Sequence, residues 1–534
     1  MVNPASVLSA VTVAVEAEGA CLREEFHRPD GPRGRRGSAP VDTEIEERLR
    51  ARLQQLVRCA FVGEETGFQE GDSAANEKNF LWLVDPHDGT SDFLSGRRGS
   101  SVSVALLRGG VPVLGVVHCP LPPDRAPDTI AWAEGAALQR NGRALSVELS
   151  RRALAPGELV WTNSTSALRP QTYSSAAQPA RYAAMPSIAY RLARVAAGDG
   201  LAAISVHEVN EYDIAAGLAL IRAAGGTMLD AAGREIHLAG TAEARRSGCF
   251  AGAPQAAARL AQFDWKRLER EPRRAARVSL GFPRTQNPIG LSRAQGCLLG
   301  LLIGDSVAAP PGSHTITGQP TAAGEMGLVL ARFLVREKSF NKEKLFSAYR
   351  DWLTTRPVEV DETTERGLLG MHTAEAETGR SLARVAPIGI WAAGDPARAA
   401  RAAHEDCALT HPNPLCLAAC AAHCAAIAAG IAGADRKEMR SAALAHASGR
   451  MLPALERALH QLANSTFEEA MAAPEPAISG ALLGAALGRE AISAQRILQV
   501  LACRPLAEAG APRPRPMELW PDDALELAEA LLQT

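Results

Sequence analysis

The pattern of apolar positions changes its character once along the chain. Up to about residue 262, short apolar runs typical of β-strands alternate with stretches of helical spacing. The strand-like runs are "LWLV" (81–84), "SVSVALL" (101–107), "VPVLGVVHC" (111–119) and "GGTMLD" (225–230). The turn "RNG" at 140–142 predicts a hairpin. This half of the pattern therefore predicts a layered α/β domain over residues 1–262.

Beyond that point the strand-like runs stop. The segment "DWKRLEREPRRAARVSLGFPRTQNPIG" (264–290) is basic and contains prolines, which is typical of a connection between domains. After it come Ala- and Leu-rich stretches of helical spacing with hardly a strand candidate. We therefore predict a multidomain chain, with a basic linker at 263–290 and an all-α domain at 291–534. A chain of 534 residues is also too long for one core.

Composition narrows the setting. With 46% apolar residues and a net charge of -2, the chain gives no general reason to expect nucleic acid or membrane partners. The N-terminal stretch 1–26 carries Glu16 and Glu18 within its apolar pattern and lacks a basic start, so it predicts an amphipathic helix rather than a signal peptide. Ten cysteines without a framework spacing favour a reducing compartment. We expect a cytoplasmic protein and leave open whether it forms a homodimer.

Candidate chemistry begins at "LWLVDPHDGTSDF" (81–93). Asp85 follows the buried run, Pro86 is expected to end the strand, and Asp88 opens a group of residues typical of a helix start. Carboxylates that hold Mg²⁺ attract phosphate, and the free N–H groups of a helix start donate hydrogen bonds to its remaining oxygens. The alternative is structural: Asp88 is a helix cap and Asp85 a turn residue. This segment alone does not decide between them.

Two other segments favour the chemical interpretation. Glu64 and Glu65 end an apolar run in "FVGEETG" (61–67), and Asp213 heads a helical stretch in "NEYDIAAGLALIRAAGGTMLD" (210–230). Taken singly, these acids are also explained as surface charge or as a helix cap. The order G-E-E, then D-P-x-D-G-T, then aromatic-D-x-A-A-G resembles the inositol monophosphatase superfamily of Mg²⁺-dependent, lithium-sensitive phosphatases. The resemblance covers residues 5–260.

The resemblance implies a set of site residues. The implied metal ligands for two or three Mg²⁺ ions are Glu64, Asp85, Asp88, Asp213 and the main-chain carbonyl of His87. The implied catalytic residues are Asp42, Thr90 and Glu64, of which Asp42 and Thr90 orient and deprotonate the attacking water. The implied substrate-binding residues are Gly89, Thr90, Ser91 and Ser187.

Two positions depart from the family pattern. Ala39 stands where a threonine usually precedes the acid at 42, and His87 stands where the family usually has Leu or Ile. Because the family uses only the carbonyl at position 87, we expect activity to survive that change. The segments 81–96 and 100–120 are most similar to the 3'(2'),5'-bisphosphate nucleotidase branch. The expected substrate is therefore a small phosphorylated metabolite, first 3'-phosphoadenosine 5'-phosphate or a related nucleotide, with inositol phosphates as the alternative. The basic loop "RPDGPRGRRG" (28–37) is either a contact for a second phosphate or a solvated loop.

The second half resembles another family. The segments that carry the resemblance are "GCLLGLLIGDSVAAP" (296–310), "GEMGLVLARFLVREKSFNKEKLFSAYRDWL" (324–353), "SLARVAPIGI" (381–390) and "ALTHPNP" (408–414). Their order and spacing are similar to those of the all-α ADP-ribosylglycohydrolases, over about 291–505.

The acids that hold two Mg²⁺ ions in that family are replaced here by Thr-Ala-Ala-Gly at 321–324 and Met-Ala-Ala-Pro at 471–474. Asp305 remains, and we expect it to cap a helix. We therefore predict a catalytically inactive domain without a cofactor, with an ADP-ribose-like group as a candidate ligand.

Two alternatives remain open at this stage. Cys416, Cys420 and Cys424 lie four residues apart, with His411 and His423 nearby, and this spacing fits either a soft-metal site or, as we favour, one buried stripe of a helix. The chain as a whole is either a working phosphatase that carries an inactive helical domain or a binding and sensing protein in which neither domain turns over a substrate.

Overall fold

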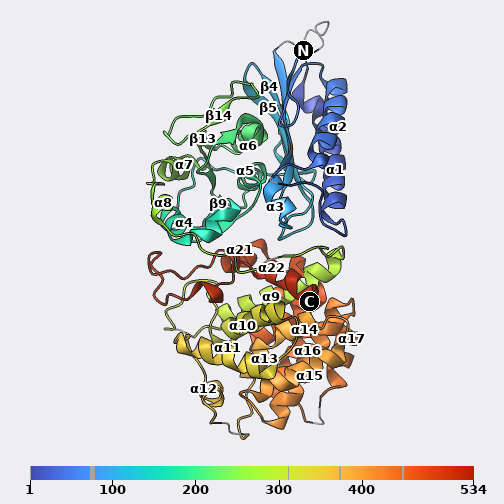
Figure 1. The fold of residues 1–534 in the computed structure, drawn as a ribbon, viewed down its shortest axis with the longest axis vertical. Coiled ribbons are helices and arrows are strands. Elements are labelled where there is room, and N and C mark those ends of the chain that lie inside the picture. Colours follow the sequence, from blue (N-terminus) through green and yellow to red (C-terminus); the bar gives the residue numbers. More distant parts are fainter. Residues whose placement is uncertain are drawn as a thin grey trace. The chain divides into compact units, whose positions relative to one another are not determined.

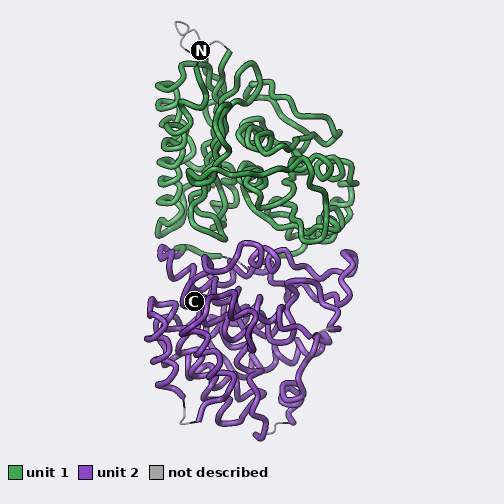
Figure 2. Tube along the Cα trace, turned by 180° about the vertical axis from the view of Figure 1, so that it is seen from behind, with its two compact units in different colours: residues 1–276, 280–284 green, residues 277–279, 285–534 purple. Residues whose placement is uncertain are grey.

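In the computed structural model the chain forms two compact units, which we call the N-terminal unit (residues 1–276 and 280–284) and the C-terminal unit (277–279 and 285–534) (Figure 2). The structure describes residues 2–35, 37–71, 79–278, 280–310, 312–371, 374–447 and 450–534. The segment expected as a linker, 263–290, is divided between the two units and contains a short helix, α8 (Arg267–Arg270).

The N-terminal unit is a stack of helix and sheet layers, as predicted (Figure 1). Its larger sheet has the spatial order β2 (Gly67–Gln69), β1 (Ala60–Gly63), β3 (Phe80–Asp88), β4 (Ser101–Arg108), β5 (Val111–Cys119), β6 (Asp128–Ala133), β7 (Gln139–Arg140) and β8 (Arg143–Ala144). Its smaller sheet has the order β10 (Arg181–Ala184), β9 (Leu159–Thr162), β11 (Ala202–Ser205), β15 (Cys249–Gly252) and β13 (Thr227–Leu229). A two-stranded ribbon pairs β12 (Val209–Asn210) with β14 (Arg245–Arg246).

Helices cover both faces of the larger sheet. α1 (Pro4–Phe26) and α2 (Pro40–Leu56) pack on one face, and α6 (Glu211–Ala223) packs on the other beside α5 (Ile188–Ala196). The remaining helices of this unit are α3 (Thr90–Leu94), α4 (Pro170–Ala177), α7 (Pro254–Ala261) and the 3-10 turn η1 (Ser164–Leu168). β1 and β3 are parallel neighbours, whereas β3 to β8 form an antiparallel meander. The predicted hairpin is confirmed, because Asn141 and Gly142 adopt positive φ between β7 and β8.

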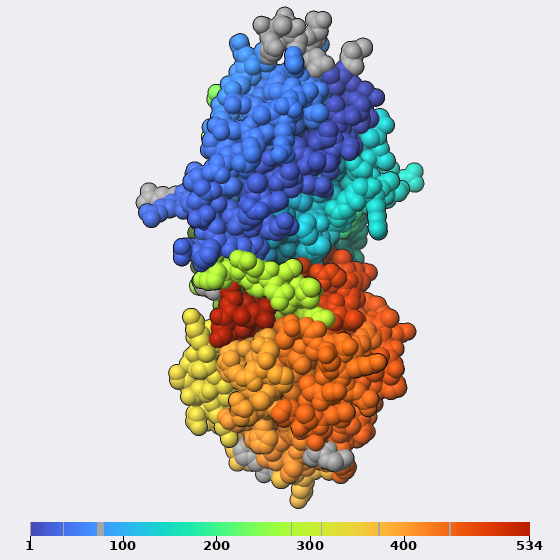
Figure 3. Space-filling view, turned by 90° about the vertical axis from the view of Figure 1, so that its right-hand side faces the viewer, coloured from blue at the N-terminus to red at the C-terminus, as the bar shows by residue number. Residues whose placement is uncertain are grey.

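The predicted N-terminal helix is confirmed as α1, which is one of two helices among the described residues that are long and apolar enough to cross a membrane by length and composition alone. α1 and α2 form the face drawn dark blue in Figure 3, and Val13 of α1 is exposed. The buried Glu18 of α1 accepts hydrogen bonds at 2.8 Å from Arg48 of α2. The second such helix, α16 (Pro414–Ile431), lies mostly inside the C-terminal core. Core helices of this kind pass the same compositional test.

The C-terminal unit is helical throughout the part of it that the structure describes, as predicted. Its helices are α9 (Pro288–Val307), α10 (Ala322–Glu337), α11 (Lys342–Thr354), α12 (Glu362–Leu368), α13 (Arg380–Arg384), α14 (Ala386–Trp391), α15 (Pro396–Ala408), α16, α17 (Arg436–Leu444), α18 (Pro453–Asn464), α19 (Phe467–Met471), α20 (Pro476–Leu487), α21 (Ala494–Leu501) and α22 (Ala524–Leu532). The 3-10 turns are η2 (Arg489–Ala491) and η3 (Met517–Leu519).

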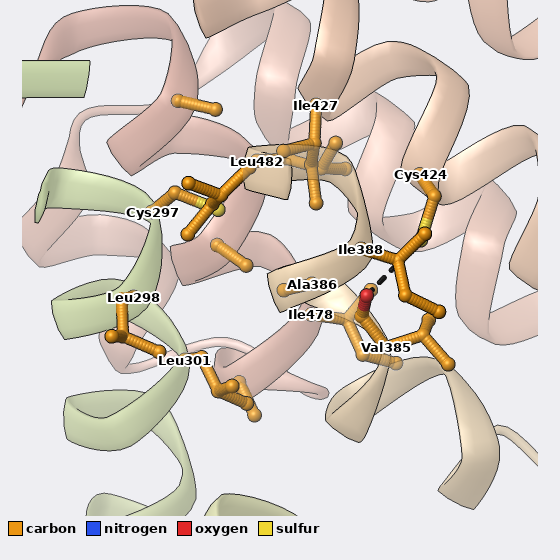
Figure 4. Packing of buried hydrophobic residues seen from close by; sticks show 14 of the residues in the cluster. Cys297, Leu298, Leu301, Val385, Ala386, Ile388, Cys424, Ile427, Ile478 and Leu482 are labelled. Carbon is orange, nitrogen blue, oxygen red and sulfur yellow. Dashed lines mark hydrogen bonds between the residues drawn. The ribbon is translucent and has the colours of Figure 1, made fainter. Parts of the chain in front are cut away.

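The central pair of this unit is α9 with α20, and glycines allow their backbones to touch. A Cβ on Gly300 would lie 2.1 Å from the carbonyl oxygen of Gly480, so no side chain fits at that crossing. Around the pair lies one large apolar cluster, in which Cys297, Leu482 and Ile427 face one another (Figure 4).

The three cysteines of α16 are buried in this cluster, as the structural interpretation expected. The Cys424 thiol donates to the carbonyl oxygen of Val385 at 3.2 Å, and the Cys420 thiol donates to the Ser381 hydroxyl at 3.4 Å. Their thiols are thus committed to neighbouring helices.

Candidate active site

The candidate site is built at the end of β3, where the structure differs from the sequence prediction. The strand was expected to end at Pro86, with a helix starting at Asp88. Instead β3 runs on to Asp88, and α3 begins only at Thr90, with Gly89 as its N-cap at φ 100°. The strand continues because a β-bulge lies between Asp85 and Asp88, and the bulge removes Pro86 from the ladder, where its missing N–H would have broken a hydrogen bond.

Two further acids join this strand end from other elements. Glu64 directly follows β1, the parallel neighbour of β3, and its N–H donates to the carbonyl oxygen of Val84 at 3.3 Å. Asp213 is the third residue of α6, and its carboxylate accepts the N–H of Asn210 at 2.8 Å. The structure therefore brings together four acids, from Glu64 to Asp213, that lie far apart in the sequence.

Exposure to solvent rises across this group, which we call the acid cluster (Glu64, Asp85, Asp88 and Asp213). Asp85 is buried, Asp88 and Asp213 are partly buried, and Glu64 is exposed. The cluster is thus closed at its base and open to solvent on one side.

Burial and mutual repulsion govern the charge of the cluster. Burial raises the pKa of Asp85 well above its usual range, and the neighbouring carboxylates raise it further. Burial also raises the pKa of Asp213, and the charge of Asp88 adds to this. For Asp88, burial raises the pKa while hydrogen bonds from the Ser187 hydroxyl (2.5 Å) and the Ala189 N–H (2.6 Å) oppose it.

The pKa of Glu64 is raised as well. Protein atoms crowd its carboxyl group and raise this pKa, and the charge of Glu65 adds to the effect, although the residue as a whole is exposed.

The charge of the acid cluster is not offset by an ion pair in the part of the chain that the structure describes. Within the described ranges, none of its members forms an ion pair with lysine or arginine. Arg191 is the arginine whose charge bears on Asp88, but its guanidinium donates to the carbonyl oxygens of Ser187 and Ile204. A group of buried carboxylates held apart from cations needs protons or a metal ion to offset its charge.

The donor set fits Mg²⁺, since every donor is a hard carboxylate or carbonyl oxygen. Side chains of His, Cys, Asp and Glu do not converge in threes into a finished metal cage anywhere in the described part of the chain. The fit therefore rests on donor chemistry and on the unbalanced charge, and not on a ligand shell that is already closed.

A second group lies against the acid cluster, and it contains the residues expected to handle the water. Asp42 is the third residue of α2 and is buried. Its Oδ2 lies 3.4 Å from the Thr90 hydroxyl and 3.2 Å from the N–H of Ala39. The Thr90 hydroxyl in turn donates to the carbonyl oxygen of His87 at 2.7 Å. The structure thus brings Asp42 and Thr90 together.

The sequence interpretation missed the ring of His87. Its Nδ1 lies 2.7 Å from Oδ1 of Asp42. The signal was present, because an imidazole stood where the family usually has an aliphatic side chain, but only the carbonyl of that residue had been considered.

The predicted substrate-binding residues fall into two groups. Gly89, Thr90 and Ser91 begin α3, and within the described residues the N–H groups of Thr90 and Ser91 donate no hydrogen bond. Ser187, by contrast, is fully buried, and its hydroxyl is occupied by Asp88 and by Ser101, 2.8 Å away.

The basic loop passes close to the start of α3. A Cβ on Gly37 would lie 2.9 Å from the Ser91 hydroxyl oxygen. Arg33 is already paired with Glu25 and Glu44, and Arg36 lies outside the described residues.

The C-terminal unit has buried acids near the start of α10. Asp305 of α9, which we expected to cap a helix, accepts the N–H (2.5 Å) and the hydroxyl (2.6 Å) of Thr321, the N-cap residue of α10. Glu325, one turn into that helix, accepts Nε of Arg515 at 2.6 Å and the indole N–H of Trp352 at 2.8 Å.

The C-terminal unit also contains a cavity of about 580 Å³, lined by the end of α9, residues 309–310 and 312–318, and part of α21. Polar groups in its lining include Ser306, His314, Thr315 and Arg496. The residues at 321–324 and 471–474 do not line it.

The two parts of the chain match two different protein families. Residues 5–267 match the inositol monophosphatase family, and residues 286–477 match the ADP-ribosylglycohydrolase family. Inositol monophosphatase 2 of Solanum lycopersicum is 30% identical over 249 residues, which are 43% of this chain and 89% of that protein.

The chain belongs to the inositol monophosphatase family.

Other members of the family match the same region. Nus factor SuhB of Pseudomonas aeruginosa is 32% identical over 39% of this chain and 78% of that protein. The Thermotoga maritima protein named fructose-1,6-bisphosphatase/inositol-1-monophosphatase is 28% identical over 41% of this chain and 82% of that protein. The solved inositol monophosphatase of Anabaena is 22% identical and covers 50% of this chain and 97% of that one, with a TM-score of 0.37. The assignment of the chain to this family therefore rests on its sequence relatives.

Proposed function

We propose that the N-terminal unit is a Mg²⁺-dependent phosphomonoesterase that acts on a small phosphorylated metabolite. One observation carries this proposal: four carboxylates, which form no ion pair with any described lysine or arginine, lie against the Asp42–Thr90 pair. The ligands that we assign to Mg²⁺ are Glu64, Asp85, Asp88, Asp213 and the carbonyl oxygen of His87. When bound there, Mg²⁺ supplies a Lewis acid for the phosphoryl oxygens and lowers the pKa of a water molecule.

The geometry assigns a role to each residue of the Asp42–Thr90 pair. Because the Thr90 hydroxyl donates its hydrogen to the His87 carbonyl, its lone pairs are left to accept a hydrogen bond from the attacking water. Oδ2 of Asp42, 3.4 Å from that hydroxyl, is placed to receive the proton that the water loses. The N–H groups of Thr90 and Ser91 are placed to bind the phosphate oxygens, and direct hydrolysis without a phosphoenzyme follows from this arrangement.

For the substrate we propose 3'-phosphoadenosine 5'-phosphate or a related nucleotide, ahead of an inositol phosphate. Arg245 supports a second anionic group on the substrate. It lies on β14 directly opposite Asn210, whose N–H bonds to Asp213 of the acid cluster. Arg245 is exposed and has no ion-pair partner among the described residues. A free guanidinium beside a phosphate site favours a bisphosphate over a monophosphate.

For the C-terminal unit we propose a helical domain without glycohydrolase activity. Of its remaining acids, Glu325 is paired with Arg515, and Asp305 accepts the N–H and the hydroxyl of Thr321. The cavity beside α9 is the candidate site for an ADP-ribose-like ligand. The cytoplasmic location and a homodimeric state remain predictions from the sequence.

The decisive experiment is phosphate release by the full chain with Mg²⁺. The panel contains 3'-phosphoadenosine 5'-phosphate, inositol 1-phosphate, fructose 1,6-bisphosphate and NADP. We expect Mg²⁺-dependent release, fastest with the bisphosphate nucleotide. Release without a divalent ion would contradict the assigned metal site. No release from any of the four would instead favour the second candidate, a nucleotide or ADP-ribose sensor, for which calorimetry of the full chain with ADP-ribose is the test.

A further inference from the structure

Asp42 has an unusual set of contacts for a residue expected to accept a proton. Its Oδ2 accepts the Ala39 N–H at 3.2 Å and lies 3.4 Å from the Thr90 hydroxyl oxygen, whose hydrogen goes to the His87 carbonyl. Its Oδ1 has one short contact, the 2.7 Å hydrogen bond with Nδ1 of His87. An ionised carboxylate only accepts hydrogen bonds, so Nδ1 carries the hydrogen. The His87 ring therefore makes the shortest hydrogen bond that holds the Asp42 side chain.

The surroundings fix this ring in place. His87 is 1% exposed, and its ring stands edge-on to Phe93, with the ring centres 4.4 Å apart and an interplanar angle of 88°. The bulge in β3 turns the residue toward α2, the helix that carries Asp42. His87 and Asp42 thus come from two elements that the ring links directly.

A packing role alone does not explain an imidazole at this position. The second ring nitrogen, Nε2, is buried without a hydrogen-bond partner in the part of the chain that the structure describes. Burying a polar atom without a partner is unfavourable, and an aliphatic side chain would fill this space without that cost. What the imidazole adds is the hydrogen bond to Asp42.

We propose that the ring of His87 is a positioning residue for the water-activating carboxylate. By donating Nδ1–H to Oδ1, it fixes the rotamer of Asp42 so that Oδ2 faces the Thr90 hydroxyl, where the attacking water is to be held. This inference rests on the proposed phosphatase function. It assigns to the side chain a role separate from that of the carbonyl of the same residue, which any amino acid at position 87 would supply.

The test compares two substitutions at this position in the full chain. His87→Leu removes the donor and keeps the bulk, whereas His87→Asn places an amide N–H near the position of Nδ1. His118→Leu is the matched control, because His118 is a buried histidine on β5 whose Nδ1 lies 2.9 Å from the Thr129 hydroxyl and which, among the described residues, makes no hydrogen bond to the acid cluster or to Asp42. The probes are 3'-phosphoadenosine 5'-phosphate and inositol 1-phosphate, each with saturating Mg²⁺.

We expect His87→Leu to lower kcat by about 10- to 100-fold, as is usual when a partner that orients a reacting group is lost, with KM unchanged. His87→Asn should restore most of kcat, and His118→Leu should leave it unchanged. Equal loss in the Leu and Asn variants, or no loss in the Leu variant, would overturn the inference while the phosphatase assignment stands. A wild-type chain inactive on both probes and on the rest of the panel would refute the proposed function and this inference with it.

A second measurement does not depend on turnover. In the full chain labelled with ¹⁵N-histidine, we expect the His87 ring to show a protonated Nδ1 whose shift changes in Asp42→Asn. The signal is assigned by its loss in His87→Asn. A His87 shift that does not respond to Asp42→Asn would show that the hydrogen bond is absent, and the positioning role would fall.

Discussion

Acidic side chains are buried in both units, but their surroundings differ. In the N-terminal unit, Asp85 and Asp88 are held by hydroxyl and N–H groups and repel each other. In the C-terminal unit, Glu325 accepts hydrogen bonds from two nitrogen atoms of Arg515. Asp406 accepts one from Nε of Arg384 at 3.0 Å. The acid cluster thus accumulates negative charge at a single place, whereas the carboxylates of Glu325 and Asp406 are each offset by an arginine.

This difference separates carboxylates proposed to bind a metal ion from carboxylates that belong to the folded scaffold. A buried carboxylate that is paired with arginine is part of the folded scaffold, and removing its partner costs stability. Carboxylates gathered without cations oppose folding until a proton or a metal ion joins them. The following predictions use these opposite expectations.

The largest effect is expected from Asp213→Asn in the acid cluster. The change removes a charge and one proposed Mg²⁺ ligand at nearly constant volume. Because loss of an outer partner of a metal ligand already costs about 10- to 100-fold, we expect loss of the ligand itself to lower phosphate release by more than about 1,000-fold. The control is Asp264→Asn, an exposed acid of the same unit. Full activity in Asp213→Asn would remove this residue from the site.

The buried ion pair of the C-terminal unit is tested by Glu325→Ala. This change leaves the guanidinium of Arg515 buried without its carboxylate partner, so we expect the free energy of unfolding to fall by about 3–5 kcal/mol. Chemical denaturation of the C-terminal unit measures this. Glu337→Ala at the end of the same helix breaks surface ion pairs with Lys344 and Arg336 and should leave the free energy of unfolding nearly unchanged. Equal losses in the two variants would show that the buried pair is not part of the scaffold.

A third prediction concerns Mg²⁺ and pH together. The folded-state pKa values of Asp85, Asp88 and Asp213 are raised. Without metal, their contribution to stability is present at low pH and is lost as pH rises from the unfolded value, about 4, through the raised values.

Mg²⁺ should reverse that loss by binding the ionised cluster. We expect Mg²⁺, compared with a chelator, to raise Tm more at about pH 8 than at about pH 5.5. At a free Mg²⁺ concentration of 100 times Kd, the stabilisation should be about 2.7 kcal/mol. A metal effect that does not depend on pH would contradict a binding site made of these carboxylates.

The smallest effect is expected at Arg245, which refines the substrate assignment. Arg245→Ala should raise KM for 3'-phosphoadenosine 5'-phosphate about tenfold, the effect of one lost charged hydrogen bond, and leave KM for inositol 1-phosphate unchanged. Arg143→Ala, an exposed strand arginine on β8, is the control. An equal change for both substrates would show that Arg245 does not bind a second anionic group.

The sequence predicted those features that depend on local pattern and on motif order. The strand-like runs became β3, β4 and β5, and the cysteine stripe of α16 became part of a core. The gathering of Glu64 with Asp213 also followed from the motifs, because the resemblance already implied a common site.

Other features depend on contacts between distant parts of the chain, and these were not predictable. Arg515 lies 190 residues beyond Glu325, and nothing near either residue indicates the pair. The hydrogen bond of His87 to Asp42 spans 45 residues and depends on the rotamer of the ring. The rule that proline ends a strand failed at Pro86 because a bulge relieves the missing N–H.

The bulge in β3 determines the side of the strand to which Asp85 and Asp88 point. Side chains of a regular strand alternate between its faces, so residues three apart point in opposite directions. One additional residue between Asp85 and Asp88 shifts this alternation by half a period and turns both carboxylates to the same side. A deletion of one residue here would therefore leave the composition of the motif almost intact and still separate its two acids across the sheet. In this protein the interval D-x-x-D encodes an irregularity in the strand, and that irregularity places the two charges together.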